Sequence, residues 1–242
     1  MARHVLAEVD STNALALRLA PDLTGPAWFL AATQSAGRGR RARAWSSPEG
    51  NFHASLLTFP DGPPSAVALR SFAIALALWD ALAALTGQGP RLALKWPNDV
   101  LLDGAKVAGI LLESTGTGGR IEHLAIGVGV NLVAAPPPEA LESGALPAVS
   151  ILGQTGQTIT PAALLDVLAP AYARWETVLE RQGFAPLREA WLARAARLGE
   201  PITARTAKAT FHGRFETIDL HGHLILHTAS ERLAIPAADV FF

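Results

Sequence analysis

The stretch Q-S-A-G-R-G-R-R-A-R-A-W, residues 34–45, places four arginines and two glycines just before a tryptophan. Glycine lets a backbone approach a ligand closely and adopt positive φ. Arginine presents a planar fork that matches carboxylate and phosphate oxygens. A solvated charged turn and a nucleic-acid arm are the other interpretations of such a stretch. A loop that binds an anionic, phosphate-bearing ligand is the interpretation we test, and we expect the loop to be mobile until that anion is present.

A second cationic region follows at K-W-P-N-D-V, residues 95–100, and K-V-A-G-I-L, residues 106–111. The ordinary interpretation of Lys95 is a surface lysine beside a core tryptophan. The functional interpretation is a fixed cation where negative charge develops during phosphoryl or nucleotidyl transfer. Asn98 and Asp99 are turn formers, and their oxygens also suit Mg²⁺.

Three further features are ambiguous when taken alone. Ser11-Thr12-Asn13 is a plain helix N-cap by local criteria. Trp45 is either a core residue or a ring that stacks on adenine. The run Gly127-Val128-Gly129-Val130-Asn131 ends a predicted strand, and its glycines by themselves say little about a ligand.

Composition limits the class of protein. The chain has 242 residues, half of them hydrophobic, a formal net charge of −1 and no cysteine. The charge argues against a general nucleic-acid binder, and the absent cysteine excludes disulfides and thiol nucleophiles. The N-terminus lacks the apolar region of a signal peptide. The apolar run 72–85 carries Asp80 and falls short of the roughly 20 residues that span a bilayer, so we expect a soluble, cytoplasmic protein.

Hydrophobic periodicity and turn residues predict the elements. We expect strands over 4–9, 28–32, 51–59, 92–96, 106–113 and 122–130. Helices are expected over 14–20, 66–86, 161–183 and 186–198, with Pro170 kinking or dividing the third. Residues 202–242 show short alternating runs typical of a small all-β barrel. This change in character places a domain boundary near Gly199 and divides the chain into 1–198 and 199–242.

The three motifs, Ser11-Thr12-Asn13, residues 34–45 and K-W-P-N-D, occur in an order that resembles the biotin protein ligases, which attach biotin to carrier-protein lysines. The resemblance covers nearly the whole chain. It implies an α+β fold: a mixed-sheet, class II synthetase-like (biotin/lipoate ligase) catalytic domain followed by a small C-terminal SH3-like β-barrel. The family has glycine where this chain has Ala42, which costs the loop some backbone freedom.

The resemblance also implies site residues. Lys95 and Arg40 are the implied catalytic residues, with Lys95 on the biotin carboxylate and the α-phosphate. The implied biotin contacts are Ser11, Thr12, Asn13, Gln34, Arg38, Gly39, Arg40 and Lys95. The implied nucleotide contacts are Arg41, Arg43, Trp45, Asn98, Lys106 and Asn131. No residue is assigned to a metal.

By the same resemblance, biotin and ATP with Mg²⁺ form biotinyl-5′-adenylate, and a lysine of the biotin carboxyl carrier protein of acetyl-CoA carboxylase then takes the biotinyl group. The match begins at the first predicted strand, which implies a short form without an N-terminal DNA-binding domain, and hence no DNA partner. The missing signal peptide and bilayer-length run lead us to expect no membrane partner. Homodimers through a sheet edge are compatible with the family.

Two other functions remain open at this point. A lipoate or octanoate ligase or transferase shares the implied fold but lacks the arginine signature. A non-catalytic biotin- or nucleotide-binding module is the second, and the presence of both Lys95 and the arginine loop argues against it.

Overall fold

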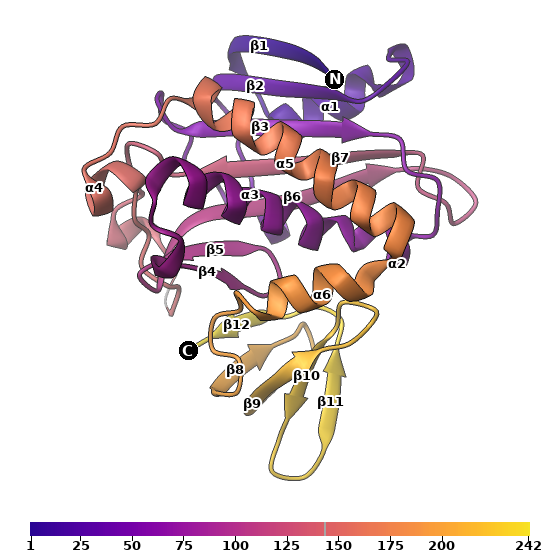
Figure 1. Ribbon diagram of the computed structural model, residues 1–242, viewed down its shortest axis with the longest axis vertical. Helices are drawn as coiled ribbons and strands as arrows, with labels where there is room; N and C mark the ends of the chain where they lie inside the picture. Colours follow the sequence, from indigo (N-terminus) through magenta and orange to yellow (C-terminus); the bar gives the residue numbers. More distant parts are fainter. Residues whose placement is uncertain (143) are drawn as a thin grey trace.

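The larger of the two sheets in the computed structural model, which describes residues 1–142 and 144–242, is seven-stranded and mixed. Its order is β1-β2-β3-β7-β6-β5-β4, as Figure 1 shows. Strands β1 (Ala2–Val9) and β2 (Ala27–Gln34) pair in parallel, and every other neighbour is antiparallel. The remaining strands are β3 (Phe52–Thr58), β4 (Leu92–Lys95), β5 (Asp99–Leu102), β6 (Ala105–Thr115) and β7 (His123–Val130).

Helix α1 (Thr12–Leu19) provides the crossover that a parallel β1–β2 pair requires. Ser11 begins it as the predicted N-cap, because its Oγ accepts a hydrogen bond from the Ala14 amide at 3.4 Å. Ala16 and Ala20 pack with Phe29 and Leu57 on this face of the sheet. Because β1 and β2 are parallel, the turn from β1 into α1 lies at the same end of the sheet as the last residues of β2.

Helices α3 (Arg70–Thr86) and α5 (Pro161–Gln182) cover the opposite face (Figure 1). Their apolar side chains and those of the strands form one continuous core. The short helix α2 (Pro64–Ala68) precedes α3, and Gly87, at φ +67°, ends α3 as the sequence predicts.

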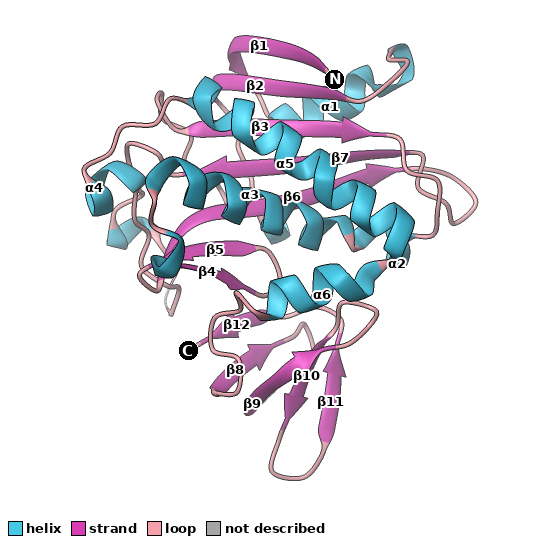
Figure 2. Cartoon of the chain, viewed as in Figure 1, coloured by secondary structure: helices cyan, strands magenta, loops and turns pink. Residues whose placement is uncertain are grey.

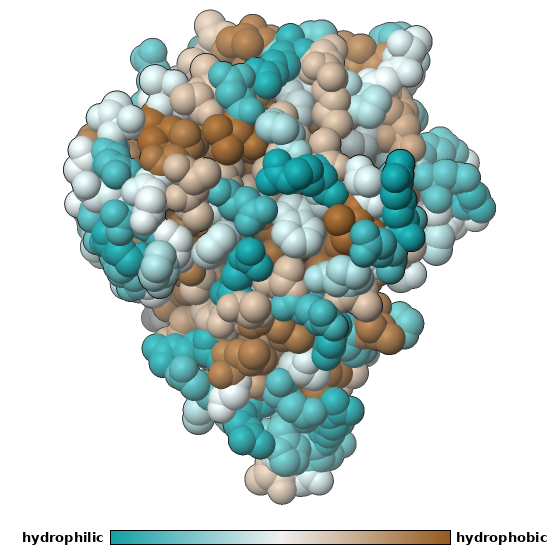
Figure 3. Space-filling view, viewed as in Figure 1, coloured by the Kyte–Doolittle hydropathy of each residue, from teal (hydrophilic) through white to brown (hydrophobic). Residues whose placement is uncertain are grey.

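The helical stretch Pro64–Thr86 has 23 residues and a hydropathy of 1.6, enough by length and composition to cross a membrane. The length argument made from residues 72–85 was therefore wrong. What distinguishes this stretch is its packing, since 56% of the apolar window is buried inside the protein between the sheet and α5. This is the environment of a core helix. Figure 3 shows the hydrophobic side chains of one outer face in small patches among hydrophilic ones.

A second, five-stranded antiparallel sheet forms the C-terminal part, below α6 (Phe184–Leu192) in Figure 2. Its order is β11-β10-β9-β8-β12. Trp191 of α6 contacts the rings of Phe72 and Phe215 and so joins the two sheets through one core. The strands are β8 (Pro201–Arg205), β9 (Thr210–Ile218), β10 (Leu224–His227), β11 (Arg232–Ile235) and β12 (Asp239–Phe241).

The structure confirms the α+β fold and corrects several elements. Strand β5 was missed, because the segment between the predicted strands 92–96 and 106–113 was interpreted as a connection, whereas its residues 99–102 form a strand. Helix α6 begins and ends earlier than predicted, and α5 runs unbroken through Pro170. Helix α4 (Ile151–Thr155), begun by the N-cap Ser150, was also missed. Short 3₁₀ turns lie at Ala20–Asp22, Arg40–Ala42, Gly89–Arg91 and Pro138–Ala140.

Candidate active site

A row of register-matched residues crosses the sheet on the face that carries α1. Lys95 of β4 pairs with Asp99 of β5, Asp99 with Gly109 of β6, and Gly109 with Gly129 of β7. Directly opposed residues in antiparallel strands project from the same face. The row therefore sets a cation and a carboxylate beside a platform of two glycines that has no side chains.

The indole of Trp45 occupies that platform. A Cβ at Gly129 would lie 2.5 Å from Trp45 Cε2, and one at Gly109 would lie 3.2 Å from Trp45 Cζ3. The Nζ atom of Lys106 lies 5.6 Å from the indole centroid, within the range of a cation–π contact. The indole therefore lies directly on bare strand backbone, and its ring borders a lysine at this end of the site.

The next row of the sheet carries a small polar cluster. Gly127 pairs with Ser55 of β3, and a Cβ at Gly127 would lie 2.6 Å from Oδ1 of Asn13. Ser55 Oγ lies 2.7 Å from Thr12 Oγ1 and 2.6 Å from Asn13 Oδ1. Oε1 of Gln34 accepts from the Thr12 amide at 2.9 Å. The parallel pairing of β1 and β2 brings Gln34 to the start of α1.

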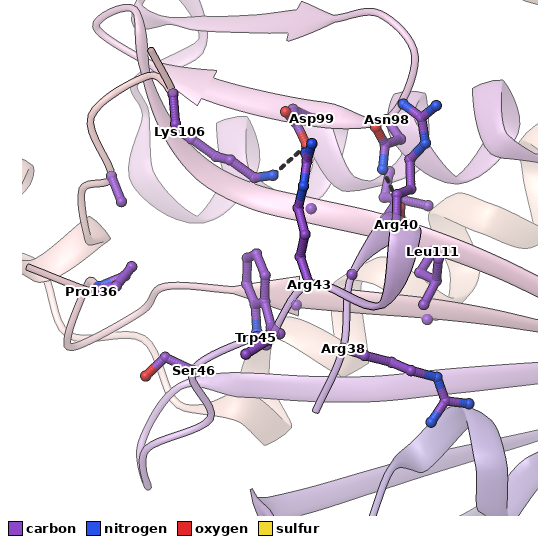
Figure 4. Close-up of a pocket in the computed structure, with 18 of the residues that line it drawn as sticks. Arg38, Arg40, Arg43, Trp45, Ser46, Asn98, Asp99, Lys106, Leu111 and Pro136 are labelled. Atoms are coloured by element: carbon purple, nitrogen blue, oxygen red, sulfur yellow. Dashed lines mark hydrogen bonds and ion pairs between the residues drawn. The ribbon is translucent and has the colours of Figure 1, made fainter. Parts of the chain in front are cut away.

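Both rows open into one cavity of about 530 Å³. Its two ends differ in chemistry: neutral donors and acceptors at Thr12, Asn13 and Gln34, and cations at Lys95 and Lys106. In Figure 4, Lys106 reaches Asp99, whereas Arg38 points away from them. The cavity therefore suits a ligand in which a polar, uncharged group is joined to an anionic group.

At the cationic end of the cavity, two lysines share one carboxylate. Lys106 Nζ lies 2.7 Å from Asp99 Oδ1, and Lys95 Nζ lies 3.7 Å from Asp99 Oδ2. Lys95 is 9% exposed, and burial lowers its pKa below the usual lysine value; Asp99 acts to raise this pKa, and Lys106 acts to lower it. Two lysines on one carboxylate leave positive charge facing the cavity, where an anion is stabilised.

The arginine loop is a closed hairpin above these rows. The Gly39 amide donates to Arg43 O at 2.8 Å, and the Trp45 amide donates to Gly37 O at 2.9 Å. At the polar end, Arg38 donates to both oxygens of Glu113 at 3.0 and 3.2 Å. The same carboxylate accepts from Asn13 Nδ2 at 2.8 Å. Glu113 thus connects the loop with the Ser-Thr-Asn motif.

Arg43, Arg41 and Arg40 meet the C-terminal sheet at Asp239. Desolvation acts to raise the pKa of Asp239, but the hydrogen bond from Arg43 and the charges of the three arginines hold that pKa below its usual value. Burial lowers the pKa of Arg40, while Asp239 acts to raise it. The carboxylate therefore stays ionised in this setting.

The cavity brings together all but one of the predicted site residues. The exception is Arg41, whose guanidinium is turned to Asp239. The predicted residues at the cavity are Ser11, Thr12, Asn13, Gln34, Arg38, Gly39, Arg40, Arg43, Trp45, Lys95, Asn98, Lys106 and Asn131.

Two of these residues also hold the backbone together. Asn98 Nδ2 donates to Ile110 O at 2.5 Å, and Asn131 Nδ2 donates to Val149 O at 3.2 Å. Sequence reasoning missed Ser55, Glu113 and Asp239 as partners in the site. The sequence could have identified Glu113, because every second residue from Gly109 along β6 projects from the sheet face that carries the cavity.

For Mg²⁺, the candidate carboxylate Asp99 is already engaged by two lysines. Over residues 1–142 and 144–242, no three His, Asp or Glu side chains gather as a metal-ligand set. The donor set thus suits an ion that arrives with phosphate oxygens better than one held by the protein alone.

The comparisons with known proteins point to one family. Residues 5–131 match the family model described as the biotin/lipoate A/B protein ligase family, and residues 198–242 match the one described as the biotin protein ligase C terminal domain. The Paracoccus denitrificans biotin–[acetyl-CoA-carboxylase] ligase is 58% identical over 98% of this chain and 99% of its own length. The Escherichia coli bifunctional ligase/repressor BirA is 32% identical over 92% of this chain and 68% of its own.

A solved structure gives the fold an independent counterpart. The biotin protein ligase from Aquifex aeolicus in complex with biotin and ATP superposes with a TM-score of 0.83 over 99% of this chain and 98% of its own, at 23% identity. At that identity the likeness speaks for the fold alone. The matched models and the 58% identical relative establish more, and on them the chain belongs to the biotin/lipoate A/B protein ligase family.

Proposed function

We propose that this protein is a biotin–[biotin carboxyl carrier protein] ligase that forms biotinyl-5′-adenylate from biotin and ATP and transfers the biotinyl group to a carrier lysine. One observation carries the proposal: a single cavity joins a neutral polar end at Thr12, Asn13 and Gln34 to a cationic end at Lys95 and Lys106. The name of the 58% identical relative supports the same substrate pair.

Biotin fits the cavity with its ring at the polar end and its carboxylate toward Lys95. The ring's ureido group offers two N–H donors and one carbonyl acceptor, which the cavity-lining Asn13, Thr12 and Gln34 can satisfy. The apolar side chain of Leu111, which pairs with Gly127 across β6 and β7, lines the cavity beside these polar groups. Placed in this way, the carboxylate points to the end of the cavity that Trp45 and Lys106 line.

In the first step, a carboxylate oxygen of biotin attacks the α-phosphorus of ATP, and pyrophosphate leaves. Negative charge grows on the α-phosphate oxygens, and the ammonium of Lys95 lies where it can offset that charge. Adenine stacks at the indole of Trp45, and Lys106 draws phosphate oxygens to the same end. Further charge on the phosphates would be neutralised by Mg²⁺ bound to ATP itself, while Lys95 and Lys106 supply the protein's positive charge at this end of the cavity.

In the second step, the ε-amine of the carrier lysine attacks the acyl carbonyl and AMP leaves. The adenylate is already activated, so the protein supplies position and shielding rather than a nucleophile. Arg38, Gly39 and Arg40 form a cover over the mixed anhydride, which keeps water away until the carrier arrives.

The decisive measurement is the intact mass of a biotin carboxyl carrier domain after incubation with the protein, biotin, ATP and Mg²⁺. We expect a gain of one biotinyl group that requires ATP. Lipoate and octanoate replace biotin in parallel reactions; modification by either of these alone would assign the chain to the lipoyl branch of the family. No modification with any acid, although biotin raises the midpoint of thermal unfolding, would identify a non-catalytic binding module.

We also propose the partners and the division of labour in the chain. The exposed edge strand β1, with Val5 75% exposed, supports a homodimer through the sheet edge. The near-neutral charge supports a protein that binds neither DNA nor membranes, and dependence on ATP supports a cytoplasmic location. Residues 1–198 act as the catalytic unit, and residues 199–242 support it.

A further inference from the structure

One carboxylate of the last strand connects the arginine loop to the C-terminal sheet. Asp239 Oδ2 accepts from Arg41 Nη1 at 2.6 Å and from Arg43 Nη2 at 2.8 Å. Arg40 Nη1 lies 3.9 Å from Asp239 Oδ1 and donates to Ala238 O at 3.1 Å. Asp239 is itself only 8% exposed. Three consecutive loop cations thus converge on one buried anion.

The loop conformation that these contacts hold is strained. Arg41 has φ +56° and Ala42 has φ +58°, the left-handed region that residues with a Cβ avoid. Strained backbone persists only where surrounding interactions impose it. The two hairpin hydrogen bonds join residues before this pair to residues after it. Arg41 itself and Arg43 form the ion pairs with Asp239.

We infer that Asp239 is a positioning residue that orders the arginine loop before any ligand binds, by supplying from within the chain the anion that the clustered arginines otherwise lack. The arginines repel one another, and a loop with two glycines and two left-handed residues does not stay closed against that repulsion. The buried carboxylate offsets the repulsion and fixes Arg40 and Arg43 at the cavity wall.

Two alternatives are weaker as the source of order. Glu142 also contacts Arg43, at 2.8 Å, but its side chain is 56% exposed and pairs with only one arginine. Glu113 holds Arg38 at the start of the loop and reaches none of the three later arginines. Asp239 alone among these carboxylates joins the strained part of the loop to a different sheet.

The test is amide hydrogen exchange of residues 37–43 in the unliganded, full-length protein. Asp239→Asn keeps the shape of the side chain and removes its charge. We expect amide exchange in the loop to become faster by about tenfold or more, because one charge-assisted contact is lost. Asp239→Glu restores the charge and should recover slow exchange. Glu216→Gln breaks an exposed ion pair with Arg232 in the same sheet and is the matched control, with loop exchange unchanged.

A second variant keeps the inference testable if Asp239→Asn fails to fold. Ala42→Gly removes the Cβ that opposes positive φ. Amide exchange in the loop should therefore slow, by a factor on the order of several-fold, because glycine adopts the left-handed conformation without strain. A second readout, which rests on the proposed function, is biotin transfer to serum albumin by released adenylate. Asp239→Asn should raise it, and Glu216→Gln should not.

The outcomes separate the two proposals. Fast loop exchange in Asp239→Asn without any biotin transfer by the wild type would support the positioning role and remove the ligase assignment. Loop exchange equal in wild type, Asp239→Asn and Ala42→Gly would overturn the positioning role whatever the enzyme does to albumin.

Discussion

The indole of Trp45 lies on Gly129 so closely that a methyl group there would stand 2.5 Å from Cε2. Gly127, two residues earlier on β7, has the same relationship to Asn13, whose Oδ1 would lie 2.6 Å from a Cβ. The two glycines of one strand therefore shape opposite ends of the cavity. A pair of alanine variants can address each end separately.

Gly129→Ala should displace Trp45 and raise the KM for ATP about tenfold or more, since a lost stacking surface of this kind is worth at least ~1.4 kcal/mol. Gly127→Ala should displace Asn13 and raise the KM for biotin instead. Steady-state pyrophosphate release with each substrate varied in turn separates the two effects. Equal changes in both constants for both variants would contradict the division of the cavity into two ends.

Lys95→Ala should fold normally and lose most adenylate formation, by a factor of about 100 or more, as for other groups that stabilise developing charge. Lys95→Arg should also be poor, because the longer fork cannot take the place of a compact ammonium 3.7 Å from Asp99. Pyrophosphate release at saturating biotin measures both. Lys208→Ala, at an exposed lysine in the connection between β8 and β9, is the control. Near-wild-type rates in the alanine variant would remove Lys95 from the mechanism.

The pH profile of adenylate formation should carry the signature of Lys95. Its pKa is lowered by burial, and its ammonium is present only below that pKa. The kcat/KM for ATP should therefore fall as pH rises through the lowered pKa, at a lower pH than an exposed lysine of pKa about 10.4 would give. Lys95→Arg keeps its charge, so its residual activity should lack this limb. The same alkaline limb in both proteins would assign it to another group.

Arg40→Gly should weaken retention of the adenylate more than it weakens binding of biotin, because only the adenylate adds a phosphate for the guanidinium to bind. Released biotinyl-adenylate acylates lysines indiscriminately. Biotin transfer to serum albumin should therefore rise several-fold, on the order of one lost charge-assisted contact. Arg120→Gly removes an exposed turn arginine and should change nothing. The companion measurement is hydrogen exchange of residues 37–43, which the adenylate should slow in the wild type.

We expect no sequence-specific DNA binding. The net charge is −1, and Arg38, Arg41 and Arg43 are already paired with carboxylates rather than extending a basic face. Gel-shift assays with promoter DNA at physiological salt, with biotin and ATP present, check this. A sequence-dependent shift that survives added salt would contradict it.

The local chemistry of the site was predictable, and its pairings were not. Glycine and arginine content identified the loop, and the cap at Ser11 fixed the start of α1. Lys95 and Asp99 were placed in one motif, but the missed strand β5 hid the register that sets them opposite each other. Register depends on the whole sheet, so it does not follow from one strand's composition.

Long-range partners were harder still. Nothing near Asp239 in sequence marks it as the anion of a loop near the N-terminus, because strand β12 is too short to show a pattern. The bounds of helix α6 were predicted wrongly for a related reason. Trp191 of this helix packs against Phe215 of the second sheet, and the residues after Leu192 form turns. Tertiary contacts set these elements, and local propensity does not.

The contact between Arg41 and Asp239 spans 198 residues, which has a consequence for the growing chain. Translation delivers the arginine loop well before its anchoring carboxylate. On the ribosome, the catalytic sheet can therefore fold around its cavity while the loop above it still lacks its anchor. Synthesis of β12 is then the step that supplies the loop with its anchor. On the role inferred for Asp239, a polypeptide truncated before β12 would leave the arginine loop without this anchor.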